Sequence, residues 1–308
     1  MSPIRLAIAG FGKIARDQHL PAIAATDSIE LVAVASRNAA PDGMPRFETL
    51  AELLAHGPQI DAVALCTPPQ VRREQAATAL AAGKHVLLEK PPGATVSEIA
   101  PLAAAAQRNG KTLFAAWHSR FAPAVEPARE LLSGREIRSV RVEWKEDVRV
   151  WHPGQDWIFE PGGLGVFDPG INALSILTHI LPRPFFLREA TLAFPANRGT
   201  PVAASLAFSD AGGSPILADF DFLQAGPQTW DIAVETDIGP LTLSAGGARL
   251  AQDGRLLATE GKREYDGIYA RFADLIARGV SDVDVAPLAH VADAFMLGRR
   301  TVAAPFDW

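Results

Sequence analysis

The chain has 308 residues, of which 48% are hydrophobic, and this length suits one large or two medium domains with substantial cores. Its net charge of −6 and the lack of a long basic run argue against a nucleic-acid partner. The apolar stretches are too short to cross a bilayer, and the first residues enter a strand without the pattern of a signal peptide. We therefore expect a cytoplasmic protein with no membrane partner. The chain has a single cysteine, Cys66, so it cannot form an internal disulfide. The sequence contains no cluster of cysteines and histidines of the kind that binds a metal.

The first part of the chain alternates predicted strands with predicted helices. Short hydrophobic runs predict strands at residues 4–9, 30–35, 61–66, 85–88 and 112–116. Helices are expected after the first of these strands and at residues 70–82 and 96–108. Alternation of this kind is typical of a parallel, doubly wound α/β sheet.

The pattern changes after residue 120. A helix at 126–133 and an alternating strand at 140–145 come first. Further strands are then predicted at 189–194, 203–208, 216–222, 230–235 and 241–244, and helices at 269–278 and 287–300. Strands that follow one another without helices favour a mostly antiparallel sheet. We therefore assign residues 121–308 to a second α/β domain.

A glycine turn joins the first strand to its helix. Residues 10–15, with Gly10 and Gly12, have the pattern G-x-G-x-x-A. The first glycine allows a tight turn, and the second lets the backbone approach a pyrophosphate at the helix N-terminus. A plain turn is the alternative, but the position between strand and helix predicts a Rossmann NAD(P)-binding domain at residues 1–120. Gly10, Gly12, Lys13 and Ile14 are the residues expected to contact the dinucleotide.

The ends of the second and third strands bear on the identity of the cofactor. The second strand ends at Ser36 and Arg37, without the carboxylate that would bind the ribose 2′-hydroxyl of NAD. A hydroxyl and a guanidinium suit a 2′-phosphate, so we predict NADP, with NAD open as a second cofactor. A solvated loop arginine is the alternative for Arg37. Thr67 and Pro68 follow the third strand, and they form either a wall for the cofactor or only a rigid turn.

A lysine follows the fourth strand, in the sequence Glu89-Lys90-Pro91-Pro92. The carboxyl ends of parallel strands are where such sheets bind ligands. An ammonium group at this place would lie beside the nicotinamide ring of the cofactor and favour a developing alkoxide on a substrate. Glu89 would orient Lys90 or contact the cofactor, and Pro91 would fix the turn, with a cis bond as one option. A surface lysine is the alternative.

A glycine-rich segment at residues 162–172 ends in a second candidate pair. Asp168 and Asn172 are four residues apart, so both can face one side of a helical turn. Asp168 is a candidate proton acceptor, and Asn172 is a candidate partner for a substrate hydroxyl. A helix cap is the alternative for Asp168.

Aromatic and polar residues that suit a sugar lie near these segments. Aromatic rings can stack on the C–H faces of a sugar, while carboxylates and imidazoles hydrogen-bond its hydroxyls, and ordinary packing is the alternative for each residue. The candidates are His118, Glu146, Trp151, His152 and Trp230. We assign no role to the isolated histidines His19, His56, His85, His179 and His290.

The glycine turn, the Glu89-Lys90-Pro91 sequence and the segment at 162–172 together resemble the Gfo/Idh/MocA oxidoreductases, and the resemblance covers the whole chain. It implies a Rossmann domain followed by an α/β domain with a large open, mostly antiparallel sheet. It also implies NAD(P)-dependent oxidation or reduction of a sugar or polyol with Lys90 at the active site. Homo-oligomers that pack through the open sheet are common in this family.

Longer runs at residues 12–21, 89–95, 117–120, 144–182 and 281–285 resemble the bacterial L-arabinose and D-galactose 1-dehydrogenases. That similarity implies oxidation of the anomeric carbon to a lactone, with the choice between the two sugars open. Many family members carry a histidine where this chain has Asn172, and an amide cannot take a proton. The base is then Asp168, our choice, or Lys90. The alternatives are another sugar or inositol dehydrogenase of the family, or a non-catalytic regulator that senses NAD(P) and sugar.

Overall fold

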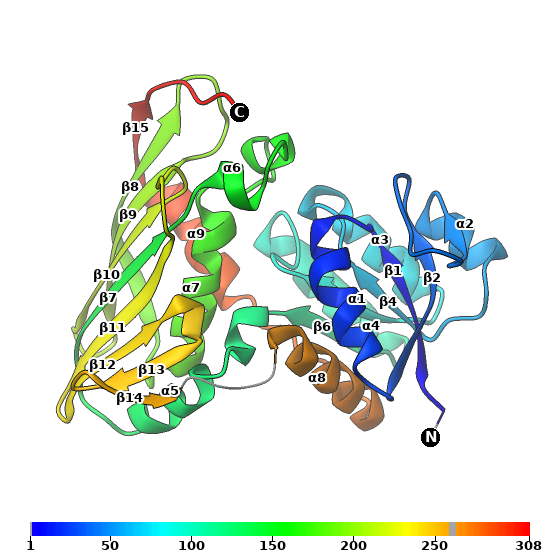
Figure 1. The fold of residues 1–308 in the computed structure, drawn as a ribbon, viewed down its shortest axis with the longest axis horizontal. Helices are drawn as coiled ribbons and strands as arrows, with labels where there is room; N and C mark the ends of the chain where they lie inside the picture. Colours follow the sequence, from blue (N-terminus) through cyan, green and yellow to red (C-terminus); the bar gives the residue numbers. More distant parts are fainter. Residues whose placement is uncertain (1, 259–262) are drawn as a thin grey trace. The chain divides into compact units, whose positions relative to one another are not determined.

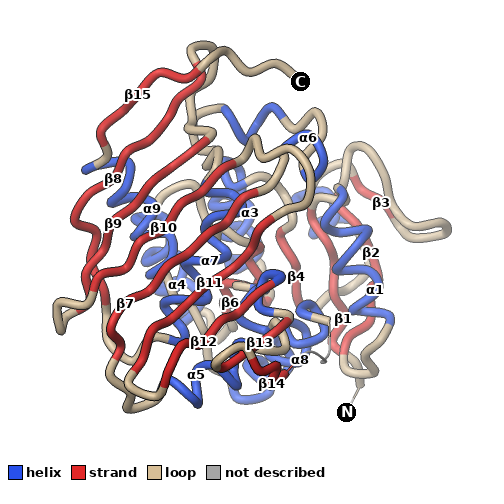
Figure 2. The backbone as a smooth tube through the Cα atoms, turned by 60° about the vertical axis from the view of Figure 1, so that its left-hand side comes forward, coloured by secondary structure: helices blue, strands red, loops and turns tan. Residues whose placement is uncertain are grey.

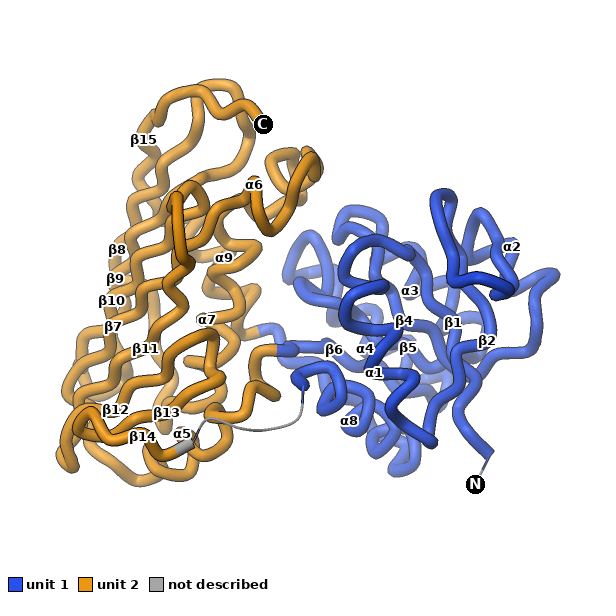
Figure 3. Tube along the Cα trace, viewed as in Figure 1, with its two compact units in different colours: residues 1–118, 263–285 blue, residues 119–262, 286–308 orange. Residues whose placement is uncertain are grey.

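The computed structural model describes residues 2–258 and 263–308. They form two compact units, residues 2–118 with 263–285 and residues 119–258 with 286–308 (Figure 3). The predicted division at residue 120 was continuous, whereas in the structure residues 263–285 return to the first unit. They do so because helix α8 (Glu264–Arg278) packs on helix α1 (Leu20–Ala24), and Asp282 forms a bridge with Phe114. Within the described residues, every helix is too short or too polar to cross a membrane.

The first unit is built on a parallel sheet that has six strands among the described residues, in the order β3-β2-β1-β4-β5-β6 (Figure 1). Each neighbouring pair is parallel, which confirms the predicted doubly wound sheet. The inner strands are apolar because both of their faces are covered by helices. The strands are β1 (Ile4–Ala9), β2 (Ile29–Ala35), β3 (Arg46–Phe47), β4 (Ala62–Leu65), β5 (His85–Glu89) and β6 (Leu113–Ala116).

The helices of this unit form two groups. Helices α2 (Leu50–His56), α3 (Pro69–Ala81) and α4 (Ile99–Arg108) pack side by side, and α1 packs with α8. The helix after the glycine turn opens with a π-helical segment, η1 (Ala15–His19), before α1. Strand β3 and helix α2 were not predicted, although the hydroxyl of Thr49 accepts the N–H of Glu52 (3.1 Å) as an N-cap does.

The second unit contains a sheet with nine strands among the described residues, in the order β14-β13-β12-β11-β7-β10-β9-β8-β15 (Figure 2). Only the pairs β10–β7 and β15–β8 are parallel, so the sheet is mostly antiparallel, as predicted. Helices α5 (Val125–Leu132), α7 (Phe167–Ile180) and α9 (Ala286–Leu297) pack on this sheet. The strands are β7 (Ile137–Lys145), β8 (Phe185–Pro195), β9 (Ala203–Asp210), β10 (Pro215–Asp221), β11 (Thr229–Thr236), β12 (Gly239–Ser244), β13 (Arg249–Gln252), β14 (Arg255–Ala258) and β15 (Arg299–Ala303).

Two details of the second unit differ from the prediction. The last helix was expected to reach residue 300, but it ends before Gly298, and the next residues form β15 along β8. A Cβ at Gly298 would lie 2.9 Å from Leu192 of β8, so the chain passes too close to that strand for another residue. The hairpin of β13 and β14 was also missed, although its Asp253-Gly254 turn is a known hairpin signal.

Candidate active site

The glycine turn of the first unit has the shape that a dinucleotide requires. Gly10 has φ +87°, and a Cβ there would lie 2.8 Å from the backbone nitrogen of Thr67, so only glycine fits. A Cβ on Gly12 would meet nothing within 4 Å, so open space lies at the start of the helix. The free N–H groups and the dipole of a helix N-terminus favour a phosphate there. Lys13 and Ile14 lie exposed in the first turn, with Lys13 Nζ 2.5 Å from the carboxylate of Asp17.

The loop after β2 carries Arg37 and is contacted by a second arginine, Arg46. The hydroxyl of Ser36 accepts the N–H groups of Asn38 and Ala39 (both 3.4 Å), and Arg37 is exposed. Arg46 on β3 donates to the carbonyls of Ser36 (3.3 Å) and Arg37 (3.0 Å). The sequence prediction missed Arg46 because its contact with this loop depends on the pairing of β3 with β2.

Thr67 and Pro68 lie where β4 leads into helix α3. The Thr67 hydroxyl donates to Gln75 Oε1 (2.6 Å), and Pro68 is the N-cap of α3. The backbone of Thr67 also contacts the glycine turn, since its nitrogen is the atom nearest to a Cβ on Gly10. These two strand ends therefore lie side by side.

The turn after β5 has a cis peptide bond between Lys90 and Pro91. The carboxylate of Glu89 is buried, with 3% of the residue exposed. Its Oε2 accepts the N–H of Lys90 (2.8 Å), while its Oε1 accepts the hydroxyl of Tyr265 (2.6 Å) and lies 2.9 Å from His19 Nε2. The carboxylate is therefore engaged with protein groups, which favours the expected orienting role over a contact with cofactor.

The environment keeps His19 and Glu89 charged. Burial opposes the charge on Glu89, but the hydrogen bond and charge of His19, the charge of His118 and the Tyr265 hydroxyl together lower its pKa to about 2. Burial also opposes the charge on His19, but Cys66, Tyr269 and Glu89 raise its pKa well above 6.5. We assigned no role to His19 from sequence because its partners lie on β4, β5 and α8, far away along the chain.

His118 also contacts helix α8. Its Nδ1 lies 2.5 Å from Glu264 Oε2, and its ring stacks on Tyr265, with centroids 5.5 Å apart. Glu264 and Tyr265 lie before residue 269, where the predicted helix begins, so neither was a candidate. The histidine keeps its place as a candidate sugar ligand, and Glu264 holds its orientation.

Asp168 lies in the first turn of helix α7 in the second unit. It is buried, with 3% exposed, and its Oδ2 lies 3.3 Å from His152 Nε2. The N-cap residue of α7 is Val166, so Asp168 is inside the helix rather than at the cap position. A Cβ on Gly170 would lie 2.5 Å from the ring of Phe220, so this glycine lets the helix start close to β10. Asn172 follows one turn later and is partly exposed.

Three tryptophans, Trp144, Trp151 and Trp230, form an aromatic wall in the second unit. Trp230 Nε1 donates to the buried carboxylate of Glu146 (2.9 Å), and the ring of Trp151 is 5.0 Å from the ring of Trp230. Trp144 stacks on Trp230 at 6.1 Å. His152, which contacts Asp168, follows Trp151 of the aromatic wall directly in the chain, so the wall and the His152–Asp168 pair are neighbours. The structure thus brings together the sugar candidates that belong to this unit.

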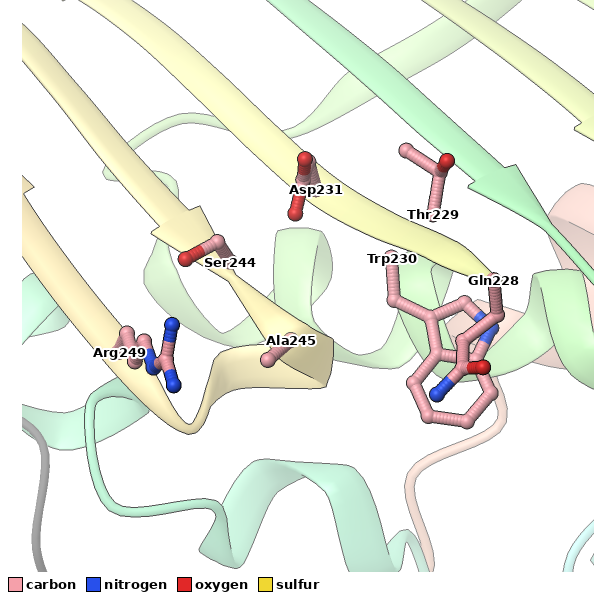
Figure 4. Close-up of a pocket in the computed structure, with 7 residues that line it drawn as sticks. All are labelled: Gln228, Thr229, Trp230, Asp231, Ser244, Ala245 and Arg249. Atoms are coloured by element: carbon pink, nitrogen blue, oxygen red, sulfur yellow. The ribbon is translucent and has the colours of Figure 1, made fainter. Parts of the chain in front are cut away.

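A pocket of about 300 Å³ opens beside the wall (Figure 4). Arg249 of β13 lines it along with residues of β11 and of the β12 end, and burial raises the pKa of Asp231 within it. Trp230 lines both the pocket and the wall, whereas its neighbours Thr229 and Asp231 point to the opposite face of β11 from its ring. Its lining is Gln228, Thr229, Trp230, Asp231, Ser244, Ala245 and Arg249.

Comparison with known proteins shows the family. A family model described as an oxidoreductase family with an NAD-binding Rossmann fold, Gfo/Idh/MocA, matches residues 4–117. The galactose 1-dehydrogenase of Pseudomonas fluorescens is 47% identical over 308 residues, which is 99% of each chain.

This chain belongs to the Gfo/Idh/MocA oxidoreductase family.

Two solved structures share the fold of this chain. The crystal structure of a D-galactose-1-dehydrogenase protein from Rhizobium etli is 59% identical, with a TM-score of 0.95 over 100% of this chain and 99% of that one. A 3-ketoreductase from Actinomadura kijaniata, crystallised with TDP-benzene and NADP, is 22% identical and has a TM-score of 0.82 over 98% of this chain and 99% of that one. This second similarity concerns the fold alone. The predicted family and the predicted fold class, a Rossmann sheet followed by a large, mostly antiparallel sheet, are confirmed.

Proposed function

We propose that this oxidoreductase is an NAD(P)-dependent aldose 1-dehydrogenase that converts D-galactose, L-arabinose or both to the lactone. The observation that carries the proposal is the 47% identity with a galactose 1-dehydrogenase over the full length of both chains. The second unit supports it independently, because a buried carboxylate, an imidazole and an aromatic wall suit a sugar. L-Arabinose shares the ring hydroxyl configuration of D-galactose and lacks only its exocyclic hydroxymethyl group, so both sugars are candidates.

The reaction removes a hydride from the anomeric carbon and a proton from the anomeric hydroxyl. When bound, the nicotinamide cofactor accepts the hydride. Asp168 takes the proton, because a carboxylate is ionised at neutral pH, and His152 at 3.3 Å orients it. The ammonium of Lys90 stabilises the developing alkoxide, and the alternative is that Lys90 is itself the base. Asn172 orients the substrate, since its amide cannot accept the proton.

The remaining sugar contacts follow from residue chemistry. The imidazoles of His118 and His152 and the carboxylate of Glu146 hydrogen-bond the hydroxyl groups of the substrate. Trp151 and Trp230 stack on its C–H faces. The Trp230 indole is held for this purpose by its hydrogen bond to Glu146 (2.9 Å).

NADP is the proposed cofactor, with NAD as a second one. Ser36 and Arg37 bind the 2′-phosphate, and Arg46 adds a second guanidinium to the same loop. The backbone at Gly10 and Gly12 holds the pyrophosphate, as the open space at Gly12 permits. Lys13, Ile14, Thr67 and Pro68 flank the bound dinucleotide.

A steady-state comparison tests the proposal. D-Galactose, L-arabinose, other aldoses and myo-inositol are each assayed with NADP⁺ and NAD⁺, and the products are identified. The highest kcat/KM is expected for D-galactose or L-arabinose with NADP⁺, and the product is a lactone. A keto-sugar or an oxidised inositol would indicate another dehydrogenase of the family, and a lack of cofactor reduction with any sugar would favour a sensing regulator.

The expected homo-oligomer is part of this proposal. Phe186 on β8 and Leu217 on β10 are exposed and pair with Ser209 and Ala207 of β9, so they share one face of the sheet. Burial of such apolar side chains against a second copy would be favourable. Sedimentation of the wild type against a Phe186→Glu/Leu217→Glu variant measures whether this face carries the association.

A further inference from the structure

The turn that carries Lys90 is held by buried charged groups, of which only Glu89 was expected from sequence to act on the lysine. Glu89 accepts the N–H of Lys90 through Oε2 (2.8 Å), and its other oxygen is occupied by Tyr265 and His19. A buried carboxylate needs hydrogen bonds or a charged partner to stay ionised. Here one is provided, and it comes from the helix that follows the glycine turn.

His19 is fixed as firmly as the carboxylate that it contacts. The side chain is fully buried in the π-helical segment η1, and its Nδ1 lies 2.6 Å from the Tyr269 hydroxyl. Its ring meets the rings of Tyr265 (4.8 Å) and Tyr269 (5.7 Å) edge-on. Both nitrogens therefore have partners and two tyrosine rings pack against the imidazole, so it has little freedom to turn. π-Helical turns of this kind often occur at functional sites.

A buried arginine holds the opposite side of the same turn. Arg72 of helix α3 donates hydrogen bonds to the carbonyls of Glu89 and Pro91, and also to the carbonyl of Thr67. The N–H of Lys90 and the carbonyls on either side of it are thus all bound by charged side chains inside the protein. Main-chain movement at Lys90 would have to break several charge-assisted hydrogen bonds at once.

We propose that the buried His19–Glu89 pair positions Lys90: through the carboxylate of Glu89 it fixes the backbone of the lysine and so the reach of its ammonium group. This role rests on the function proposed above for Lys90. The pair joins the helix of the glycine turn to the turn that carries Lys90. It therefore fixes the position of Lys90, which acts on the substrate, relative to the backbone that binds pyrophosphate. His19 and Glu89 act through Lys90, and neither needs to contact a reactant.

The same contacts could serve only to hold helices α1 and α8 on the sheet. The two possibilities differ in what happens to Lys90. If the pair positions the lysine, loosening the pair releases its N–H and damages turnover by way of the ammonium group. If the pair is only structural, it lowers stability as any core substitution does, and the effect on turnover is independent of Lys90.

Hydrogen exchange at the Lys90 N–H tests the first step without any assay of activity. This N–H reports on the turn alone because Pro91 and Pro92 have none. Glu89→Gln and His19→Gln should each speed its exchange by about tenfold or more, since one charge-assisted hydrogen bond is lost. Tyr265→Phe, a milder change, should have a smaller effect in the same direction. Leu102→Ala, a buried substitution in α4, provides a matched loss of stability and should leave the exchange at Lys90 unchanged.

A double-mutant cycle tests the second step. Glu89→Gln should lower kcat by about 10- to 100-fold, as expected for a small displacement of a catalytic group. When Glu89→Gln is added to Lys90→Met, kcat should fall by less than about threefold relative to Lys90→Met alone, because the effect of Glu89 passes through the lysine. The dissociation constant for NADP⁺ should stay within about threefold of the wild-type value in both variants.

Unchanged exchange at Lys90 in Glu89→Gln, or a loss of turnover that persists in full in the Lys90→Met background, would overturn the positioning role. Wild-type turnover in Lys90→Met would instead overturn the role proposed for the lysine itself. The exchange measurement would then still decide whether the pair holds the turn, so the two failures are distinguishable.

Discussion

Asp168 is the carboxylate proposed above as the general base. It is buried at the positive end of helix α7, and such a position favours the ionised carboxylate. His152 Nε2 lies 3.3 Å from this carboxylate, and 23% of the His152 side chain is exposed. If Asp168 is the base, as proposed, the imidazole offers its proton a route to solvent.

Asp168→Asn should abolish most turnover. The amide keeps the size of the side chain but cannot accept a proton, so kcat should fall by about 10²- to 10⁴-fold, the usual contribution of a general base. The binding of NADP⁺ measured by fluorescence titration should be unchanged. Asp210→Asn is the matched control, because Asp210 is also buried and paired, with Arg183, but has no role in the reaction. Near-normal turnover in Asp168→Asn would move the base to Lys90.

Arg37→Ala should discriminate between the two cofactors. Loss of a charge-assisted hydrogen bond to the 2′-phosphate should raise the KM for NADP⁺ by about tenfold or more, and Arg46→Ala should act in the same direction. The KM for NAD⁺, which lacks that phosphate, should change little. Arg108→Ala, an exposed substitution at the end of α4, is the control. Equal changes for NADP⁺ and NAD⁺ would contradict the assignment of these arginines.

The chemistry of single residues explains which of them could be predicted. Lys90 could be found because it follows a buried strand, and Asp168 because it is placed four residues before Asn172 after a glycine segment. His19 could not be predicted as a site residue, because its partners lie on β5 and α8 and only the folded structure brings them to η1. Arg46 lies on a two-residue strand too short to leave a pattern.

At the scale of elements, the His19–Glu89 pair joins η1 to β5, and two tyrosines of α8 cover it. The two charges titrate in opposite directions. The pKa of Glu89 is lowered from 4.5 to about 2, so its contribution to stability is present above 4.5 and is lost as the pH falls toward 2. The pKa of His19 is raised, so its contribution is complete below 6.5 and is lost as the pH rises through the raised value.

The pair should therefore contribute most to stability between about pH 4.5 and 6.5. Urea denaturation at a series of pH values compares the wild type with His19→Gln. The difference in the free energy of unfolding should be on the order of 1–3 kcal/mol within this window and should shrink on both sides of it. A difference that does not vary with pH would show that His19 acts through packing alone.

The last residues of the chain fasten the segment that carries Trp151 and His152. Phe306 is buried and packs on Phe159 (5.0 Å), with the guanidinium of Arg149 4.8 Å from its ring centre. Arg149 and Phe159 lie on either side of the two sugar candidates along the chain. The tail is thus expected to set the position of that segment.

Phe306→Ala should raise the KM for the sugar several-fold, with a smaller effect on kcat, because the segment becomes less well placed. The cavity should also lower stability by about 3–5 kcal/mol. Phe185→Ala, a buried substitution on β8 whose ring stacks on His290, is the matched control and should cost similar stability. An equal rise in KM in the control would show that general destabilisation, rather than the tail, is responsible.

At the scale of the whole molecule, the order of helices and strands could be predicted from sequence. The return of residues 263–285 to the first unit could not. Hydrophobic periodicity identified the parallel sheet and the later run of strands, because each pattern is local. The membership of α8 in the first unit depends on the contacts that its tyrosines make with His19 and Glu89, and no local pattern records these. The same holds for β15, whose partner β8 lies about a hundred residues earlier.

The central claim is that hydride leaves the anomeric carbon, and D-galactose deuterated at C1 tests it most directly. With NADP⁺ the deuterium should appear in the reduced nicotinamide, the sugar product should be the unlabelled lactone, and the rate of the chemical step should fall for the deuterated sugar. Recovery of an oxidised sugar that still carries deuterium at C1, with none in the reduced cofactor, would contradict the account.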